Sequence, residues 1–145
     1  MKVKQRLLLY GIIFILLHLG GLLIFIFYTN PPKYKNPIDL FREYCECTIQ
    51  TEYVLKDKTR VDIITDTHVI EIDYASDFYE AIGQSLFYAE MTGLRPGILL
   101  HMQSGIKKKE DSKRYLDRLL IVAKKYKITV WILEDAAILL IYEGE

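Results

Sequence analysis

Three carboxylates stand in two neighbouring stretches that have the composition of β-strands. Asp62 lies in residues 59–65, and Glu71 and Asp73 lie two positions apart in residues 68–74. Because side chains alternate between the faces of a strand, Glu71 and Asp73 share one side. The tight turn between the stretches predicts an antiparallel pair that brings Asp62 beside them. Such a group of carboxylate oxygens could bind a divalent cation or accept protons.

A solvated sheet face also collects carboxylates, so the cluster has a second interpretation without chemistry. Against it, Asp62 and Asp73 lie among aliphatic residues, which is unusual for a casual surface position. Gln84 and Tyr88 add to the cluster, because they are four residues apart on the following predicted helix and project from one side of it. The pattern predicts a polar site where two strands and a helix meet.

The elements that must position these residues follow from hydrophobic periodicity and turn signals. Helices are predicted at residues 37–47, 78–91 and 111–126, and strands at 48–55, 59–65, 68–74, 97–102, 127–133 and 136–142. A helix separates the third and fourth strands, so these two are expected to be parallel. The fold class is therefore α/β, with the element order αβββαβ extended by a C-terminal helix and strands.

The N-terminal part of the chain has a different composition from the rest. Residues 7–28 are 22 residues without a formal charge, long enough to cross a hydrocarbon core of about 30 Å as a helix. No small-residue cleavage site follows, which favours an uncleaved transmembrane signal anchor at residues 1–28 over a removed signal peptide. Residues 29–36 form a proline-stiffened linker, and residues 37–145 the domain, which the charge bias places outside the cytoplasm.

The charge of the chain limits how it could bind nucleic acid. The 19 basic residues include Lys2, Lys4 and Arg6 before the apolar segment, so 16 remain against 19 acidic ones in the rest of the chain. Nucleic-acid binding must therefore depend on a local patch. The basic run in the predicted loop 103–111 is either such a phosphate-contacting patch or a solvated loop; it consists of Lys107, Lys108 and Lys109.

The chain has two cysteines, Cys45 and Cys47. They are too close in sequence for an easy mutual disulfide, and we expect Cys45 to be a small buried apolar residue. A structural zinc site is not expected, because the chain has no second cysteine pair and its histidines are scattered.

The arrangement of the polar residues resembles a known superfamily. Asp62 on the second strand, Glu71 two positions before Asp73 on the third, and Gln84-x-x-x-Tyr88 on the next helix are similar to the PD-(D/E)XK, or restriction-endonuclease-like, nucleases. More narrowly, the chain looks like short bacterial and phage proteins, often exported or membrane-attached, that carry an E-x-D variant of the motif. The resemblance covers roughly residues 41–131.

The resemblance implies a metal-dependent hydrolysis of DNA. In the superfamily, Mg²⁺ or Mn²⁺ orients a water for attack on a phosphodiester. Carried over, the metal ligands are Asp62, Glu71 and the backbone carbonyl of Ile72. Gln84 and Tyr88 are expected to position DNA at the site. An additional acidic residue seen in some members is expected from Glu43 or Glu52.

One position departs from the superfamily. Asp73 stands where those nucleases have a lysine, and an anion cannot supply the lysine's positive charge, although it can accept a proton or bind metal. Lys56, Lys58 or Arg60 could supply that charge instead. Two functions are therefore expected as alternatives: a membrane-anchored, metal-dependent endo- or exodeoxyribonuclease, or an inactive nuclease-fold module that binds nucleic acid or a partner protein at the membrane. A third alternative is an acidic face that only binds a structural divalent ion.

Overall fold

The computed structural model of this chain describes residues 13–18, 21–26, 36–102 and 106–144. The chain divides into two compact units, Met1–Tyr34 and Lys35–Glu145. This division falls inside the predicted linker at residues 29–36.

The first unit contains an antiparallel hairpin of β1 (Ile13–His18) and β2 (Gly21–Ile26). These strands lie inside residues 7–28, for which a transmembrane helix is predicted, so the structure differs from the prediction here. The physical reason is that isoleucine and phenylalanine are as apolar in a strand as in a helix and favour the strand. Within the described residues, no helix has both the length and the apolar character to cross a membrane. The remaining residues of 7–28 lie outside the described part.

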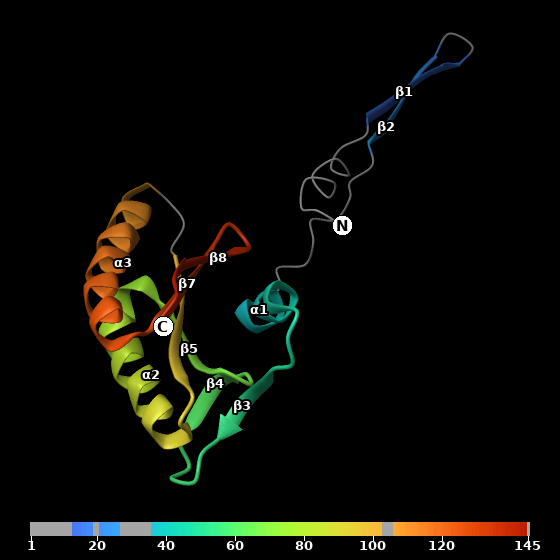
Figure 1. The fold of residues 1–145 in the computed structure, drawn as a ribbon. Helices are drawn as coiled ribbons and strands as arrows, with labels where there is room; N and C mark the ends of the chain where they lie inside the picture. Colours follow the sequence, from blue (N-terminus) through green and yellow to red (C-terminus); the bar gives the residue numbers. More distant parts are fainter. Residues whose placement is uncertain (1–12, 19–20, 27–35, 103–105, 145) are drawn as a thin grey trace. The chain divides into compact units, whose positions relative to one another are not determined.

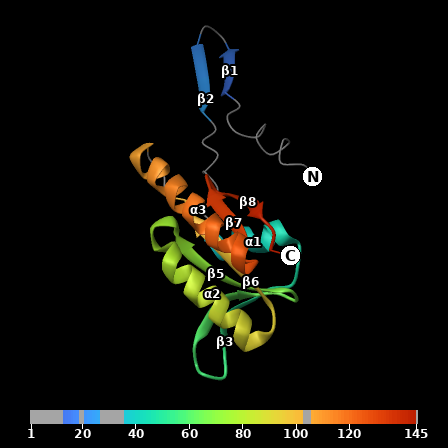
Figure 2. The ribbon, with the colours of Figure 1, turned by 60° about the vertical axis from the view of Figure 1, so that its left-hand side comes forward.

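The second unit is a mixed α/β fold with a six-stranded sheet, whose strand order is β3-β4-β5-β6-β7-β8. Helices α2 and α3 cover one face of the sheet and α1 covers the other (Figure 1). A 60° turn of the view brings α2 and α3 to the front, crossing the sheet (Figure 2). The elements are α1 (Pro37–Cys45), β3 (Gln50–Val54), β4 (Arg60–Ile64), β5 (His68–Tyr74), α2 (Phe78–Thr92), β6 (Arg95–His101), α3 (Ile106–Tyr126), β7 (Thr129–Glu134) and β8 (Ala137–Tyr142).

The predicted α/β class and element order are confirmed in this unit. β5 and β6 pair in parallel and are joined by α2, as expected, while β3, β4 and β5 pair antiparallel in sequence order. Several boundaries differ by one or two residues, and one differs by more: α3 begins at Ile106, five residues before the predicted start, so Lys107–Lys109 belong to a helix rather than a loop. Lysine is a good helix former, so a run of lysines is as compatible with a helix as with a loop. The side chains of these lysines lie outside the described part.

Alternate residues of the central strands pack on opposite faces of the sheet. Ile98 and Leu100 of β6 lie in the core under α2 and α3, whereas Leu99 lies in the core with Phe41 of α1. Gly97 begins this buried run at a point of close approach. A Cβ atom there would lie 2.9 Å from Cζ3 of Trp131. The glycine therefore lets β6 and its neighbours pack tightly.

The edge strand β8 carries several exposed apolar side chains. Leu139, Leu140 and Ile141 are 49%, 43% and 39% exposed. In the described sheet, β7 is the only strand that pairs with β8.

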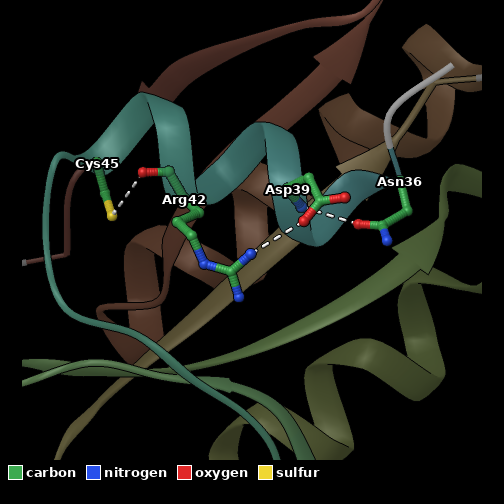
Figure 3. Close-up of polar contacts among 4 residues, drawn as sticks. All are labelled: Asn36, Asp39, Arg42 and Cys45. Carbon is green, nitrogen blue, oxygen red and sulfur yellow. Dashed lines mark hydrogen bonds and ion pairs between the residues drawn. The ribbon is translucent and has the colours of Figure 1, made fainter. Parts of the chain in front are cut away.

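Helix α1 has defined ends. Asn36 caps its first turn, because its side-chain Oδ1 accepts the backbone N–H of Asp39 at 2.8 Å, and Arg42 pairs with the Asp39 carboxylate one turn later (Figure 3). Its last residue, Cys45, forms a disulfide with Cys47. The prediction of no disulfide is wrong, because Glu46 has a left-handed backbone that brings the two Cα atoms to 5.1 Å. Cys45 is half-buried rather than buried.

Candidate carboxylate site

Strands β4 and β5 separate at the position of Asp62. Their ladder contains the pair Ile63 and Ile70 and one further pair toward the turn. One step beyond that pair, the register places Asp62 opposite Glu71. Here the Asp62 carboxylate replaces a backbone partner, since its Oδ2 accepts the N–H of Ile72 at 2.9 Å. The strands therefore open where the two carboxylates meet.

A third carboxylate continues the row across the sheet. Thr51 of β3 pairs with Ile63, so the register places Glu52 opposite Asp62. Glu52 has a positive φ of 55° and forms an ion pair with Arg60, whose Nε lies 2.7 Å from its Oε2. Of the two expected accessory acids, Glu52 is the one placed beside Asp62. The positive charge of Arg60 stabilises the ionised form of Asp62.

Glu71 has the most perturbed acid–base equilibrium of the site. Burial raises the pKa of its carboxyl from 4.5 to about 8, and the charges of Asp62, Asp73, Glu80 and Glu52 add to the rise. Its Oε2 is buried and has no hydrogen-bond partner among the described residues. At neutral pH Glu71 therefore holds a proton, unless a cation takes the proton's place.

The two aspartates are perturbed in the same direction. Burial raises the pKa of Asp62 against the opposing effect of the Ile72 N–H, and the nearby charge of Glu52 raises it further. Burial also raises the pKa of Asp73, whose Oδ1 accepts the N–H of Tyr74 at 2.8 Å. The carboxylates predicted to converge thus act on one another through their charges.

Helix α2 covers these carboxylates with a polar edge. Gln84 donates from Nε2 to Oε1 of Glu80 at 3.1 Å, and the Glu80 charge acts on both Glu71 and Asp73. Tyr88 is only 6% exposed, and burial together with the charges of Glu71 and Asp62 raises its pKa. Tyr88 is therefore placed at the site, and Gln84 is connected to the carboxylates through Glu80. Glu80 is not among the expected site residues, although its spacing of four from Gln84 puts it on the same edge of α2.

Three of the expected accessory residues are placed elsewhere. Glu43 belongs to α1, which covers the opposite face of the sheet. Lys56 and Lys58 lie in the connection between β3 and β4, and Lys56 lines a cavity of about 330 Å³ with Met91 near the end of α2. Arg60 remains the basic residue that the structure connects to the carboxylates.

An aromatic pair with one exposed ring lies next to the site in sequence. Tyr74 follows Asp73 at the end of β5, and its ring stacks on His101 of β6 with centroids 5.1 Å apart. Tyr74 is 51% exposed. Sequence reasoning missed this pair, because the stacking depends on the parallel register of β5 and β6. Because side chains alternate along β5, Tyr74 projects from the opposite face of the sheet to Asp73, so the pair is not part of the carboxylate cluster.

The donor atoms suit a hard divalent cation in part. Carboxylate oxygens are the preferred ligands of Mg²⁺, and the unpartnered Oε2 of Glu71 is free to bind one. However, the described residues include no group of three or more histidines, cysteines, aspartates or glutamates placed to hold a metal. Asp62 and Glu71 would therefore act as a two-carboxylate site completed by water, which Mg²⁺ accepts.

Comparison of the chain with protein-family models, with curated proteins and with solved structures found no match.

Proposed function

We propose that the chain is a membrane-attached, divalent-cation-dependent nuclease that hydrolyses phosphodiester bonds of DNA. The observation that carries the proposal is the half-buried pair of Asp62 and Glu71, in which one buried Glu71 oxygen has no partner among the described residues. The αβββαβ order and the position of α2 over the carboxylates support a PD-(D/E)XK-like fold.

In this proposal Asp62, Glu71 and the carbonyl of Ile72 hold Mg²⁺ or Mn²⁺. A bound cation of this kind would activate a water and offset phosphate charge. Tyr88 and Gln84 orient the DNA strand from α2. Asp73 stands where the superfamily has a lysine, so its role is to accept a proton.

The cation would also offset the negative charge of the carboxylates. Clustered carboxylates repel a phosphodiester, and the proton on Glu71 removes only part of that charge. Because cation and proton compete for Glu71, affinity for the metal should rise with pH up to about 8. Arg60 reduces the remaining charge at Asp62.

A cleavage assay tests the proposal. The full chain in detergent is incubated with labelled single- and double-stranded DNA and Mg²⁺ or Mn²⁺. We expect Asp62→Asn and Glu71→Gln to reduce cleavage by about 100-fold or more. The matched control is Glu90→Gln, an exposed residue of α2, which should cleave like wild type. Cleavage that persists in both site variants, or in EDTA, would contradict the proposal.

An inactive nucleic-acid-binding module is the alternative, favoured by two observations. Asp73 replaces the usual cation, and Arg60 is already paired with Glu52. For this alternative we expect salt-dependent DNA binding by the wild-type chain without cleavage in any cation. Cation-dependent cleavage lost in Asp62→Asn would exclude it.

The location of the domain is a separate proposal. The apolar residues 7–28 attach the chain to a membrane, with the domain outside the cytoplasm. The Cys45–Cys47 disulfide supports this side, since disulfides persist in oxidising compartments. Reporter fusions after Tyr28 and after Glu145 test it: a reporter active only in the cytoplasm should fail after Glu145.

A further inference from the structure

The disulfide at the end of α1 closes a very short loop. Only Glu46 separates Cys45 from Cys47, so the disulfide removes little entropy from the unfolded chain. It therefore stabilises the folded chain weakly, and folding in turn favours the disulfide weakly. Glu46 has φ 50° and ψ 27°, a left-handed backbone that non-glycine residues adopt at a cost. Opening the ring frees Glu46 from this requirement. Both features make the disulfide easier to reduce than one closing a long, relaxed loop.

The two sulfurs differ in access. Cys47 is exposed, whereas Cys45 is half-buried and packs against the core around Phe41. Both cysteines line an open cavity of about 480 Å³, together with Tyr44 and Trp131 among others. A small thiol can therefore reach Cys47 from solvent, while Cys45 is shielded on its core side.

The surroundings of Cys45 suit the reduced state as well as the oxidised one. The backbone N–H of Cys47 lies 3.2 Å from Cys45 Sγ and can stabilise a thiolate there. The carbonyl oxygen of Arg42 lies 3.9 Å from the same sulfur (Figure 3). That of Cys47 lies 3.7 Å from it, so a protonated thiol has acceptors too. After reduction, the Cys45 sulfur therefore has hydrogen-bond partners without any movement of α1.

The histidine in the same cavity does not take part. Nδ1 of His68 contacts the Thr67 hydroxyl at 2.8 Å, and Nε2 contacts the Thr129 hydroxyl at 3.0 Å. Burial lowers the pKa of His68 to about 4, and the charge of Arg95 adds to this, so the ring is neutral at pH 7. Protons for the exchange come from solvent.

We propose that Cys45–Cys47 is a thiol–disulfide exchange site for low-molecular-weight thiols. A thiolate attacks Cys47 Sγ and forms a mixed disulfide, while the bonding electron pair moves to Cys45 Sγ, which takes a proton from water. A second thiolate attacks the sulfur of the bound small thiol and releases Cys47 as a thiolate. The sum oxidises two small thiols to their disulfide and reduces the protein disulfide to a dithiol. This site is independent of the carboxylates.

Equilibration with glutathione tests the exchange. The native full chain in detergent is incubated at fixed pH in mixtures of reduced and oxidised glutathione, then labelled with a maleimide that shifts its gel mobility. We expect each chain to carry either zero or two labelled thiols. Half of the chains should be reduced at a ratio of reduced to oxidised glutathione that lies within the range of the mixtures. A chain that stays unlabelled in reduced glutathione alone, yet becomes labelled after denaturation and reduction, would overturn the proposal. So would a chain that stays fully labelled in oxidised glutathione alone.

Single-cysteine variants test which sulfur is attacked. In Cys45→Ser, Cys47 remains and should form a mixed disulfide with oxidised glutathione about tenfold faster than Cys45 does in Cys47→Ser, because Cys47 is exposed. Matching circular dichroism spectra and urea midpoints show that both variants are folded alike. Equal rates, or a faster reaction at Cys45, would refute the assignment of Cys47 as the attacked sulfur.

Discussion

Replacing Glu71 with Gln should make the stability of the chain less dependent on pH between about 5 and 8. Burial raises the pKa of Glu71 from 4.5 to about 8 in the folded chain. Below pH 4.5 the carboxyl is protonated in both the folded and the unfolded state. Between the two values the folded state keeps a proton that the unfolded state has released, so the free energy of unfolding falls as pH rises. Above about pH 8 the loss is complete.

The size of the effect follows from the two pKa values. A difference between about 8 and 4.5, at about 1.4 kcal/mol for each pH unit, gives an upper limit of about 5 kcal/mol. Glu71 is only half-buried, so solvent screens part of this. After that discount we expect Glu71→Gln to gain about 2 kcal/mol over wild type between pH 5 and pH 8.

Urea denaturation followed by circular dichroism measures this difference. Both chains are unfolded at several pH values from 5 to 8.5 in EDTA, so that no metal competes with the proton. The control is Glu90→Gln, which replaces an exposed residue of α2 and should follow wild type at every pH. A free-energy difference between Glu71→Gln and wild type that stays constant across this range would refute the reasoning.

Three further predictions concern the metal and the fold. Mg²⁺ at 100-fold excess over its Kd should stabilise wild type by about 2.7 kcal/mol but not Asp62→Asn, as seen in thermal melts; equal shifts would contradict the metal site. Gly97→Ala should destabilise by about 1–3 kcal/mol in urea, because its Cβ would lie 2.9 Å from Trp131. Gly83→Ala is its control, with nothing within 4 Å of the new Cβ, and should not destabilise. Asn36→Ala should cost about 1 kcal/mol by loss of the helix cap, and Asn36→Asp should not.

The central strands and the site they carry could be predicted because local pattern and tertiary structure agree there. β5 has the bounds expected from its alternation, and Glu71 and Asp73 share a side for the same reason. The parallel pairing with β6 follows from the intervening helix. The side-chain replacement of a ladder bond by Asp62 depends on where β4 and β5 separate, and strand periodicity carries no signal for that.

The missed features depend on single dihedral angles or on distant segments. The disulfide can form because Glu46 has a left-handed backbone, a conformation that a glutamate in the sequence does not predict. The stacking of Tyr74 on His101 requires two strands separated by a helix to be in one register. In the first unit, the apolar run at residues 7–28 contains no period that separates a helix from a hairpin, so its length is the signal that favours a transmembrane helix.

The outer strand β8 has a consequence for handling this protein. Its leucine and isoleucine side chains at positions 139–141 are exposed, and in the described sheet it has a partner only on its β7 side. An apolar strand with an open edge is a template for pairing with strands from other molecules. We therefore expect this edge to promote association between molecules in concentrated preparations, and charged residues along it to reduce that association.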